Sequence, residues 1–183
     1  MKLYRAKVPV IAQEAIQRLI LEGHIDVEEA RVEEAEKDLM SIMENYLRQD
    51  QRIRERVKDT MSRGNIPYNE YGRTRSRISE QMNHPVGDDV ERFLVRQFIE
   101  MLLNTPNVDE VYAEDKVIHR ELTAVLLSHH VDEGAIRDAA RERIKNVREG
   151  TVEYEDALNR AVFEEKKRRG LIGLRTAERQ QRR

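Results

Sequence analysis

The sequence predicts an all-α fold, and three observations lead to that prediction. Charged residues make up 37% of the 183 residues, while only 8 Gly and 4 Pro are present, which is typical of long solvent-exposed helices. Apolar residues recur at spacings of three and four over most of the chain, as in amphipathic helices. No stretch shows the sustained alternation that predicts a β-strand.

The first half of the chain predicts a short helix and then a long one. Pro9 suits the first turn of the short helix, where its missing N–H costs nothing, and Gly23 can end that helix. Asp26 can cap a long helix over residues 27–62, with a bend expected where the apolar stripe lapses at Gln49. The stripe consists of Val32, Ala35, Leu39, Ile42, Tyr46 and Ile53.

Two breaks and three caps organise the rest of the chain. RGNIPYNEYGR holds two Gly and one Pro and predicts a central loop, which a short helix over residues 74–82 follows. HPVGDD is a second break, after which Asp88 or Asp89 can cap the next helix. Asp109 is expected to open another helix, Asp132 to cap a further one, and a last helix follows the turn EGT.

A shift of 83 residues aligns the two halves without a gap. The shift pairs IQRLILEGHID, from Ile16, with IEMLLNTPNVD, from Ile99. The shift pairs apolar residues with apolar residues, such as Leu39 with Leu122, and predicted helix caps with predicted helix caps. The matches continue through turns as well as helices. Any two amphipathic helices in phase would give some matches, so plain periodicity is the alternative. We predict two tandem helical repeats joined by a central loop.

This interpretation divides the chain into four parts and names a core. The parts are an N-terminal helical repeat at 1–72, a linker with a short helix at 73–90, a C-terminal helical repeat at 91–169 and a basic tail without fixed structure at 170–183. The predicted core residues are Leu39, Ile42, Leu122 and Val125.

Charge is segregated along the chain. From Lys166 to Arg183, eight basic residues face Glu178 alone, a net charge of +7, so the other 165 residues carry −9 within the total of −2. A basic segment gains affinity for nucleic acid by releasing counterions from phosphates. The alternative is that the segment folds back on the acidic stretch between Glu22 and Asp38, which has eight acidic and two basic residues.

Aromatic residues stand among arginines in the central loop. Tyr68 and Tyr71 precede Arg73, Arg75 and Arg77. Aromatic rings can stack on bases while guanidinium groups hold phosphates. The alternative, favoured by the recurrence of Tyr71 after 83 residues, is that this tyrosine anchors the third element of each repeat to its long helix.

SHHVDEG is the strongest candidate for a metal site, with His129, His130, Asp132 and Glu133. Adjacent histidines on a helix point about 100° apart, whereas zinc helices use His at positions i and i+4. Asp132 and Glu133 have a simpler role as cap and first-turn acid. The chain has no Cys and no nucleotide-binding glycine motif or nucleophile motif. We therefore predict no metal, no cofactor and no enzymatic activity.

Several segments resemble one known family. LYRAKVPVIA, IPYNEYGR, VGDD, VDEVYAED and RIKNVREGT are similar to the bacterial domain-of-unknown-function family 507. The similarity runs over essentially the whole chain, from its start to KKRRGL. It implies a bacterial, cytoplasmic, helical protein and supplies no catalytic residue. The sequence contains no run of 18 apolar residues, so it does not predict a membrane-spanning helix.

We expect a non-enzymatic binding factor that associates with nucleic acid or a ribonucleoprotein. The candidate nucleic-acid-binding residues are Lys166, Lys167, Arg168, Arg169, Arg175, Arg179, Arg182, Arg183, Arg73, Arg75 and Arg77. The alternative is a protein–protein adaptor or self-associating scaffold, in which the basic end meets the acidic body of a neighbour. A metal- or carboxylate-dependent enzyme ranks third.

Overall fold

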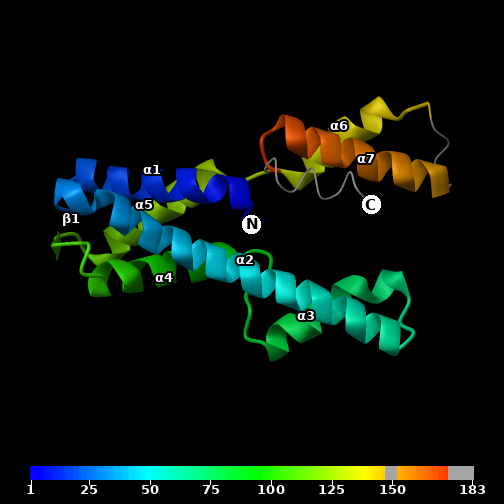
Figure 1. The fold of residues 1–183 in the computed structure, drawn as a ribbon, viewed down its shortest axis with the longest axis horizontal. Helices are drawn as coiled ribbons and strands as arrows, with labels where there is room; N and C mark the ends of the chain where they lie inside the picture. The colour runs from blue at the N-terminus through cyan, green and yellow to red at the C-terminus, as the bar shows by residue number, and fades with distance from the viewer. Residues whose placement is uncertain (147–151, 173–183) are drawn as a thin grey trace. The chain divides into compact units, whose positions relative to one another are not determined.

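The computed structural model describes residues 1–146 and 152–172, and it confirms the all-α prediction (Figure 1). The helices are α1 (Val8–Leu21), α2 (Val32–Arg63), α3 (Tyr71–Gln81), α4 (Asp89–Asn104), α5 (Asp115–Ser128), α6 (Glu133–Arg143) and α7 (Val152–Arg168). Single 3-10 turns lie at Arg5–Lys7, Glu29–Arg31 and Tyr68–Glu70. None of the described helices is long and apolar enough to cross a membrane.

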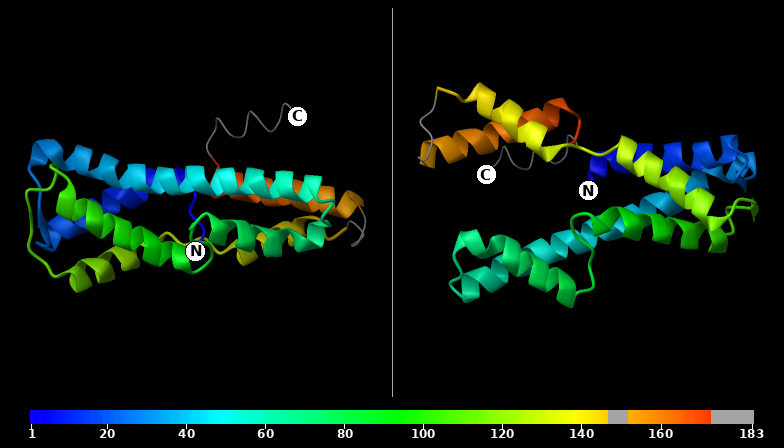
Figure 2. Two further views of the ribbon diagram at one scale, coloured as in Figure 1. Left: turned by 90° about the horizontal axis from the view of Figure 1, so that it is seen from below. Right: turned by 180° about the vertical axis from the view of Figure 1, so that it is seen from behind.

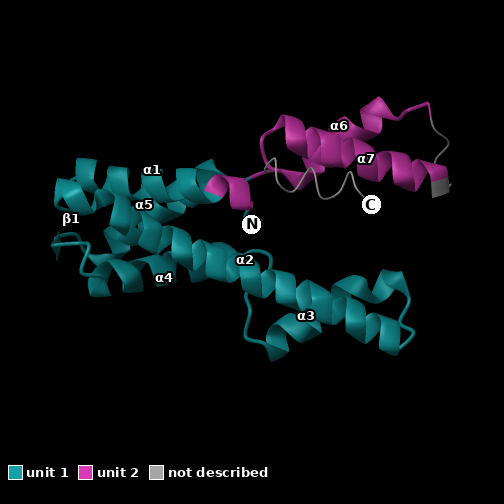
Figure 3. Cartoon of the chain, viewed as in Figure 1, with its two compact units in different colours: residues 1–3, 8–130 teal, residues 4–7, 131–183 magenta. Residues whose placement is uncertain are grey.

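The chain forms two compact units (Figure 3). Unit 1 comprises residues 1–3 and 8–130, and unit 2 comprises residues 4–7 and the chain from 131 onward. These units differ from the predicted division into 1–72, 73–90 and 91–169. The physical reason is that α2 packs against both α1 and α4, so the predicted first repeat shares its core with the helices that follow it.

Four helices surround the core of unit 1. α1 packs against α2 and α5, and α4 packs against the same two helices, which closes a ring (Figure 2). Its largest fully buried side chains include Ile11, Ile16, Leu19, Leu39, Met43, Leu94, Phe98, Leu102, Leu122 and Leu126. Of the predicted core residues, Leu39, Leu122 and Val125 are confirmed as buried. Ile42 is only partly buried, because the adjacent Met43 points into the core.

A short antiparallel ladder closes one end of unit 1. β1 (Ile25–Asp26) pairs with β2 (Glu110–Val111), and Ile25 lies opposite Val111. The prediction of a chain without strands is wrong at this point. Two residues are too few to show alternation, and the pairing joins segments far apart in the sequence.

The sequence predicts that Asp109 opens a helix, but in the structure it holds this end of the unit together through hydrogen bonds. Its Oδ2 accepts a hydrogen bond from the Glu28 backbone N–H at 2.8 Å, and its Oδ1 accepts one from Arg31. Arg31 also donates to the Pro106 carbonyl at 2.7 Å. The helix predicted to start at Asp109 starts six residues later, at Asp115.

The second half of α2 continues beyond this core and pairs with α3 (Figure 1). Ile53, Val57, Met61 and Ile78 form a separate buried cluster, with Ile66, Tyr71 and Met82 packed against it. α2 runs through Gln49 as one helix, and the stripe position that seemed vacant is taken by the buried Asp50. We call residues 48–82 the basic hairpin.

Unit 2 is built from α6 and α7 together with the segment 4–7. Ala140, Tyr154 and Leu158 form one buried cluster, and Tyr4, Ile136 and Leu171 form another. The predicted cap of α6 is confirmed, since Asp132 Oδ1 accepts a hydrogen bond from the Ala135 backbone N–H at 3.0 Å.

The order of elements agrees in part with the 83-residue shift. The shift carries the first residue of α2, Val32, onto the first residue of α5, Asp115, and the last residue of α1 onto the last of α4. However, the continuous α2 corresponds to two helices, α5 and α6, because the cap Asp132 starts a new helix where α2 has Gln49. The internal duplication therefore stays a prediction.

Candidate functional site

The basic hairpin differs in charge from the rest of unit 1. It holds nine basic and five acidic residues, a net charge of +4. The preceding residues, 1–47, hold six basic and ten acidic residues, and residues 83–130 hold four and nine. Those two segments carry −4 and −5. Without Arg5 and Lys7, which belong to unit 2, the first segment carries −6, so the hairpin is a positive part of an otherwise negative unit.

A row of arginines runs along one exposed face of α2 in the hairpin. Arg48, Arg52, Arg56 and Arg63 are all exposed, and at 100° per residue they lie within an arc of about 80°. The row is about 22 Å long, at 1.5 Å per residue. Asp59 shares the face, which leaves a net charge of +3.

Three members of this row have no acidic partner in the part of the chain that the structure describes, namely Arg52, Arg56 and Arg63. Arg48 donates to Asn45, which is neutral. Guanidinium groups that form no ion pair within the protein keep their full charge and their N–H donors available for a binding partner. The row can therefore bind anions without first breaking internal ion pairs.

The arginines predicted on α3 fall into different roles. Arg75 is half-buried and donates to Asp50 Oδ1 at 2.7 Å, so it serves the fold of the hairpin. Arg73 pairs with Glu70 at 2.9 Å. Arg77 is exposed and, within the described residues, has no ion pair. Of the three, Arg77 alone is exposed without an ion pair in the described residues, and its binding of nucleic acid stays a prediction.

Asp50 is the centre of a buried polar cluster. Arg54 donates to its Oδ2 at 2.5 Å, and His84 Nε2 lies 3.8 Å from its Oδ1. The His84 ring stacks on Tyr46, with 4.6 Å between ring centroids. Burial lowers the pKa of His84 against the opposing pull of Asp50, and burial with the Asp50 charge raises the pKa of Tyr46 to about 12. This cluster joins α3 and the loop after it to α2.

The two hairpin tyrosines differ in exposure. Tyr68 is 83% exposed, and its ring centroid lies 5.8 Å from that of Tyr71. Tyr71 is half-buried against the cluster of Met61 and Ile78. Tyr154 is buried beside Leu158 in unit 2. Tyr71 therefore packs α3 on α2, and Tyr154 packs α7 on α6, whereas the only aromatic ring that Tyr68 contacts in the described residues is that of Tyr71. The repeats that these tyrosines would anchor stay a prediction.

The described part of the basic C-terminal segment is largely ion-paired. Lys166 lies 3.0 Å from Glu133 and 5.7 Å from the ring centroid of Tyr4. Lys167 is exposed, without an ion pair in residues 1–146 and 152–172. The other predicted cations, Arg175, Arg179, Arg182 and Arg183, lie outside the described residues.

Glu165 holds Arg168 and Arg169 in unit 2. Its carboxylate is fully buried and accepts from Arg169 at 2.7 Å and from Arg168 at 2.8 Å. Arg143 approaches its other oxygen at 3.1 Å. Hydrogen bonds from Arg169 and Arg168 hold the pKa of Glu165 below its usual range. Both arginines therefore have a structural role that their sequence position did not reveal.

The histidine segment forms a contact within unit 1. His129 ends α5, and its Nε2 lies 2.7 Å from Glu14 Oε2 on α1. Over residues 1–146 and 152–172, no group of three His, Asp or Glu side chains is placed to hold a metal ion. What His129 does in the described structure is to link α5 to α1.

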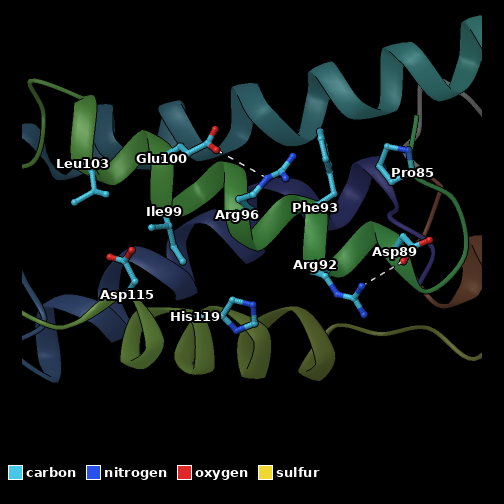
Figure 4. Close-up of a pocket in the computed structure, with 10 residues that line it drawn as sticks. All are labelled: Pro85, Asp89, Arg92, Phe93, Arg96, Ile99, Glu100, Leu103, Asp115 and His119. Atoms are coloured by element: carbon cyan, nitrogen blue, oxygen red, sulfur yellow. Dashed lines mark ion pairs between the residues drawn. The ribbon is translucent and has the colours of Figure 1, made fainter. Parts of the chain in front are cut away.

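A groove of about 560 Å³ lies between α4 and α5 (Figure 4). Its apolar side chains include Phe93, Ile99 and Leu103, and His119 extends from α5 toward α4. Arg92 and Arg96 lie 3.7 and 3.9 Å from acidic partners one turn away. All its titratable side chains are exposed, which is unlike the shielded carboxyl pairs of acid–base catalysis.

The sequence profile of a family described as "Protein of unknown function (DUF507)" matches residues 1–171. The chain belongs to this family. No curated protein matches the chain.

The DUF507 match covers unit 1 with the basic hairpin, and α6 and α7 of unit 2. It ends at Leu171, which is also the last described residue buried in unit 2. The match thus includes all the described helices, and membership in DUF507 leaves the function of the chain open.

The prediction from the sequence did not include Arg52, Arg56 and Arg63. It placed the candidate nucleic-acid-binding residues only after Tyr71 and in the C-terminal segment. A signal was present, because Arg52 and Arg56 are four residues apart and lie off the apolar stripe of the predicted helix. Acidic residues of the same segment, such as Glu55, reduce its net charge to +4, below the +7 of the C-terminal segment on which the prediction is based.

Proposed function

We propose that this chain is a non-enzymatic binding protein that associates with nucleic acid through the basic hairpin. The observation that supports the proposal is the exposed arginine row on α2, whose members Arg52, Arg56 and Arg63 have no acidic partner in the described structure. Guanidinium groups bind phosphate oxygens in a fork, and they stay charged at any physiological pH. A cytoplasmic location, implied by the family resemblance, belongs to the same proposal.

The charge distribution of unit 1 favours binding of nucleic acid at the hairpin. The acidic segments 1–47 and 83–130 repel a polyanion, whereas the hairpin attracts it. A polyanion would thus meet unit 1 at the hairpin, on the exposed face of α2. The ion-paired Lys166, Arg168 and Arg169 make the described end of the C-terminal segment a weaker candidate than the sequence suggested.

The test is a titration of labelled RNA and DNA followed by fluorescence anisotropy. We expect the variant Arg52→Gln/Arg56→Gln/Arg63→Gln to bind about tenfold more weakly or worse, with a log–log salt slope less negative by about 2 to 3, since three phosphate contacts are lost. The matched control replaces three exposed arginines elsewhere, Arg92, Arg96 and Arg137, and should bind like the wild type.

A chain ending at Ile172 tests the contribution of the C-terminal segment. This end point keeps Arg168, Arg169 and the buried Leu171, which a chain ending at Glu165 would lose together with their contacts in unit 2. If removal of residues 173–183 abolishes binding and the hairpin variant does not, the segment is the site. If the full chain fails to bind at 50 mM salt (about the low end used for such titrations), the nucleic-acid function is wrong.

The groove between α4 and α5 favours a second function, that of a protein–protein adaptor. An apolar groove with charged side chains along its edges suits the apolar face of a partner helix. Leu103, which lines it, is 55% exposed. Absence of nucleic-acid binding would give this function first place.

A further inference from the structure

Tyr68 occupies a specific place at the tip of the basic hairpin. It stands in the 3-10 turn Tyr68–Glu70, between the end of α2 at Arg63 and the start of α3 at Tyr71. The turn that carries Tyr68 therefore joins α2 to α3 at the end of the hairpin where α2 stops (Figure 1), and Arg63, the last member of the arginine row, is the last residue of α2. Tyr68 is an exposed aromatic residue that follows the last arginine of the row by five positions.

The Tyr68 ring is held yet accessible. It contacts the ring of Tyr71, tilted by 30°, and Tyr71 is itself packed on the buried cluster of the hairpin. With 83% of its surface exposed, Tyr68 leaves most of its ring in water. Single exposed apolar side chains are common on proteins, so what sets Tyr68 apart is its place in the turn at the end of the helix that carries the arginine row.

We propose that the hairpin tip recognises a single-stranded segment of nucleic acid, with an unpaired base stacked on Tyr68 and the adjoining phosphates along Arg63, Arg56 and Arg52. This inference rests on the proposed nucleic-acid function and adds the class of ligand. A base inside a duplex has both faces covered by its neighbours, so only an unpaired base can offer a face to the ring. Stacking of this kind tolerates any base sequence.

An anionic membrane surface is a poorer match for the same residues. The large apolar side chains that the described structure exposes are Val10, Leu21, Tyr68, Leu103, Tyr112 and Leu127, and Tyr68 alone of these belongs to the hairpin. Interfacial binding grows with the apolar area that enters the lipid, and one tyrosine ring supplies little. A nucleic acid needs only one ring and a row of cations.

The absence of Trp from the chain gives a direct assay. In Tyr68→Trp, the sole indole stands at the proposed stacking position. We expect an unlabelled single-stranded oligonucleotide to quench its fluorescence. Heparin, a polyanion without bases, should leave the fluorescence nearly unchanged even where it binds.

Affinity measurements complete the test. Tyr68→Ala should weaken binding of a single-stranded oligonucleotide about tenfold, within the roughly 5- to 150-fold range of base–aromatic stacking, and should leave duplex binding unchanged. Tyr68→Phe should restore single-strand binding, because the ring is retained. Tyr112→Ala is the matched control, since Tyr112 is 60% exposed and lies outside the hairpin.

The outcomes separate this inference from the proposed function. Equal single-strand binding by Tyr68→Ala and wild type, with no quenching in Tyr68→Trp, overturns the stacking inference and leaves the nucleic-acid function intact. Failure of all nucleic acids to bind overturns both. If the indole emission of Tyr68→Trp shifts to the blue with phosphatidylserine vesicles and not with oligonucleotides, the tip binds a membrane and the inference is also overturned.

Discussion

A single buried carboxylate, that of Asp50, links the two helices of the basic hairpin. Asp50 is 5% exposed on a helix face that is otherwise apolar, and its two oxygens accept from Arg75 and Arg54. A buried carboxylate without such partners would lose its hydration and gain nothing. The partner from α3, Arg75, therefore fixes where α3 lies on α2.

We expect Asp50→Asn to lower the free energy of unfolding by about 1–3 kcal/mol, because two guanidinium groups lose a charged acceptor. Both arginines retain access to water, which keeps the loss below that of a fully buried pair. Urea titrations measure the change. Asp59→Asn, on the exposed face of the same helix, should shift stability by less than about 0.5 kcal/mol, and equal effects would contradict a special role for Asp50.

His84 should make stability depend on pH. Burial lowers its pKa in the folded chain, whereas the unfolded chain titrates near the ordinary value of about 6.5. As pH falls through that value, the unfolded state binds a proton that the folded state resists, so stability is full above it and is lost toward lower pH. The groups facing His84 are Asp50, Arg75 and the stacked Tyr46.

We therefore expect His84→Gln to lose less stability than the wild type between about pH 7.5 and 5.5, a window that spans the ordinary histidine pKa, as measured by urea unfolding at each pH. His119→Gln is the control, because His119 is exposed. Parallel pH profiles for His84→Gln and the wild type would show that His84 does not contribute.

At the scale of elements, α2 joins two separate cores. Its first half contributes Leu39 and Met43 to the four-helix core, and its second half contributes Ile53 and Val57 to the hairpin cluster. The two stripes are continuous because buried residues recur at helical spacing throughout. The face opposite the hairpin stripe is then free to carry the arginine row.

Leu39→Ala and Leu122→Ala should each lower the free energy of unfolding by about 2–5 kcal/mol, the usual range for truncating a buried leucine. Both side chains are fully buried in the same core, from α2 and α5. Leu127→Ala is the matched control, since Leu127 also lies on α5 and is 51% exposed. Thermal melts without a loss for the first two would place this stripe outside the core.

At the scale of the whole molecule, unit 2 takes residues from both ends of the described chain. Tyr4 is buried with Ile136 and Leu171, so a residue near the start packs beside α6 and the end of α7. Glu165 also stabilises the unit by forming ion pairs with three arginines. Unit 2 thus depends on a segment that the sequence interpretation assigned to the N-terminal repeat.

We expect Tyr4→Ala to reduce hydrogen-exchange protection in α6 and α7 while α4 and α5 keep theirs, because a large buried ring is removed from unit 2 alone. Amide exchange followed by mass spectrometry resolves the two regions. Tyr112→Ala, which changes an exposed tyrosine of unit 1, should leave protection in both regions unaltered. Equal loss of protection across both units after Tyr4→Ala would contradict the assignment of Tyr4 to unit 2.

The helical class, most helix positions and much of the core follow from the amino-acid sequence without any tertiary information. Local signals suffice for these, as at Gly23, whose φ of +68° ends α1 as predicted, and at Asp132, which caps α6. The periodic stripes likewise placed Leu39 and Leu122 in the core, because a helix period shows itself within a few turns.

Which polar residues are free to act depends instead on how the helices pack. Asp50 with Arg75, and Glu165 with Arg143, meet only when helices pack, and no local pattern marks an arginine as already paired. The short ladder between Ile25 and Val111 has the same non-local origin. Charge counts treat all cations alike, whereas folding pairs some with buried carboxylates and leaves others, such as Arg52, in water.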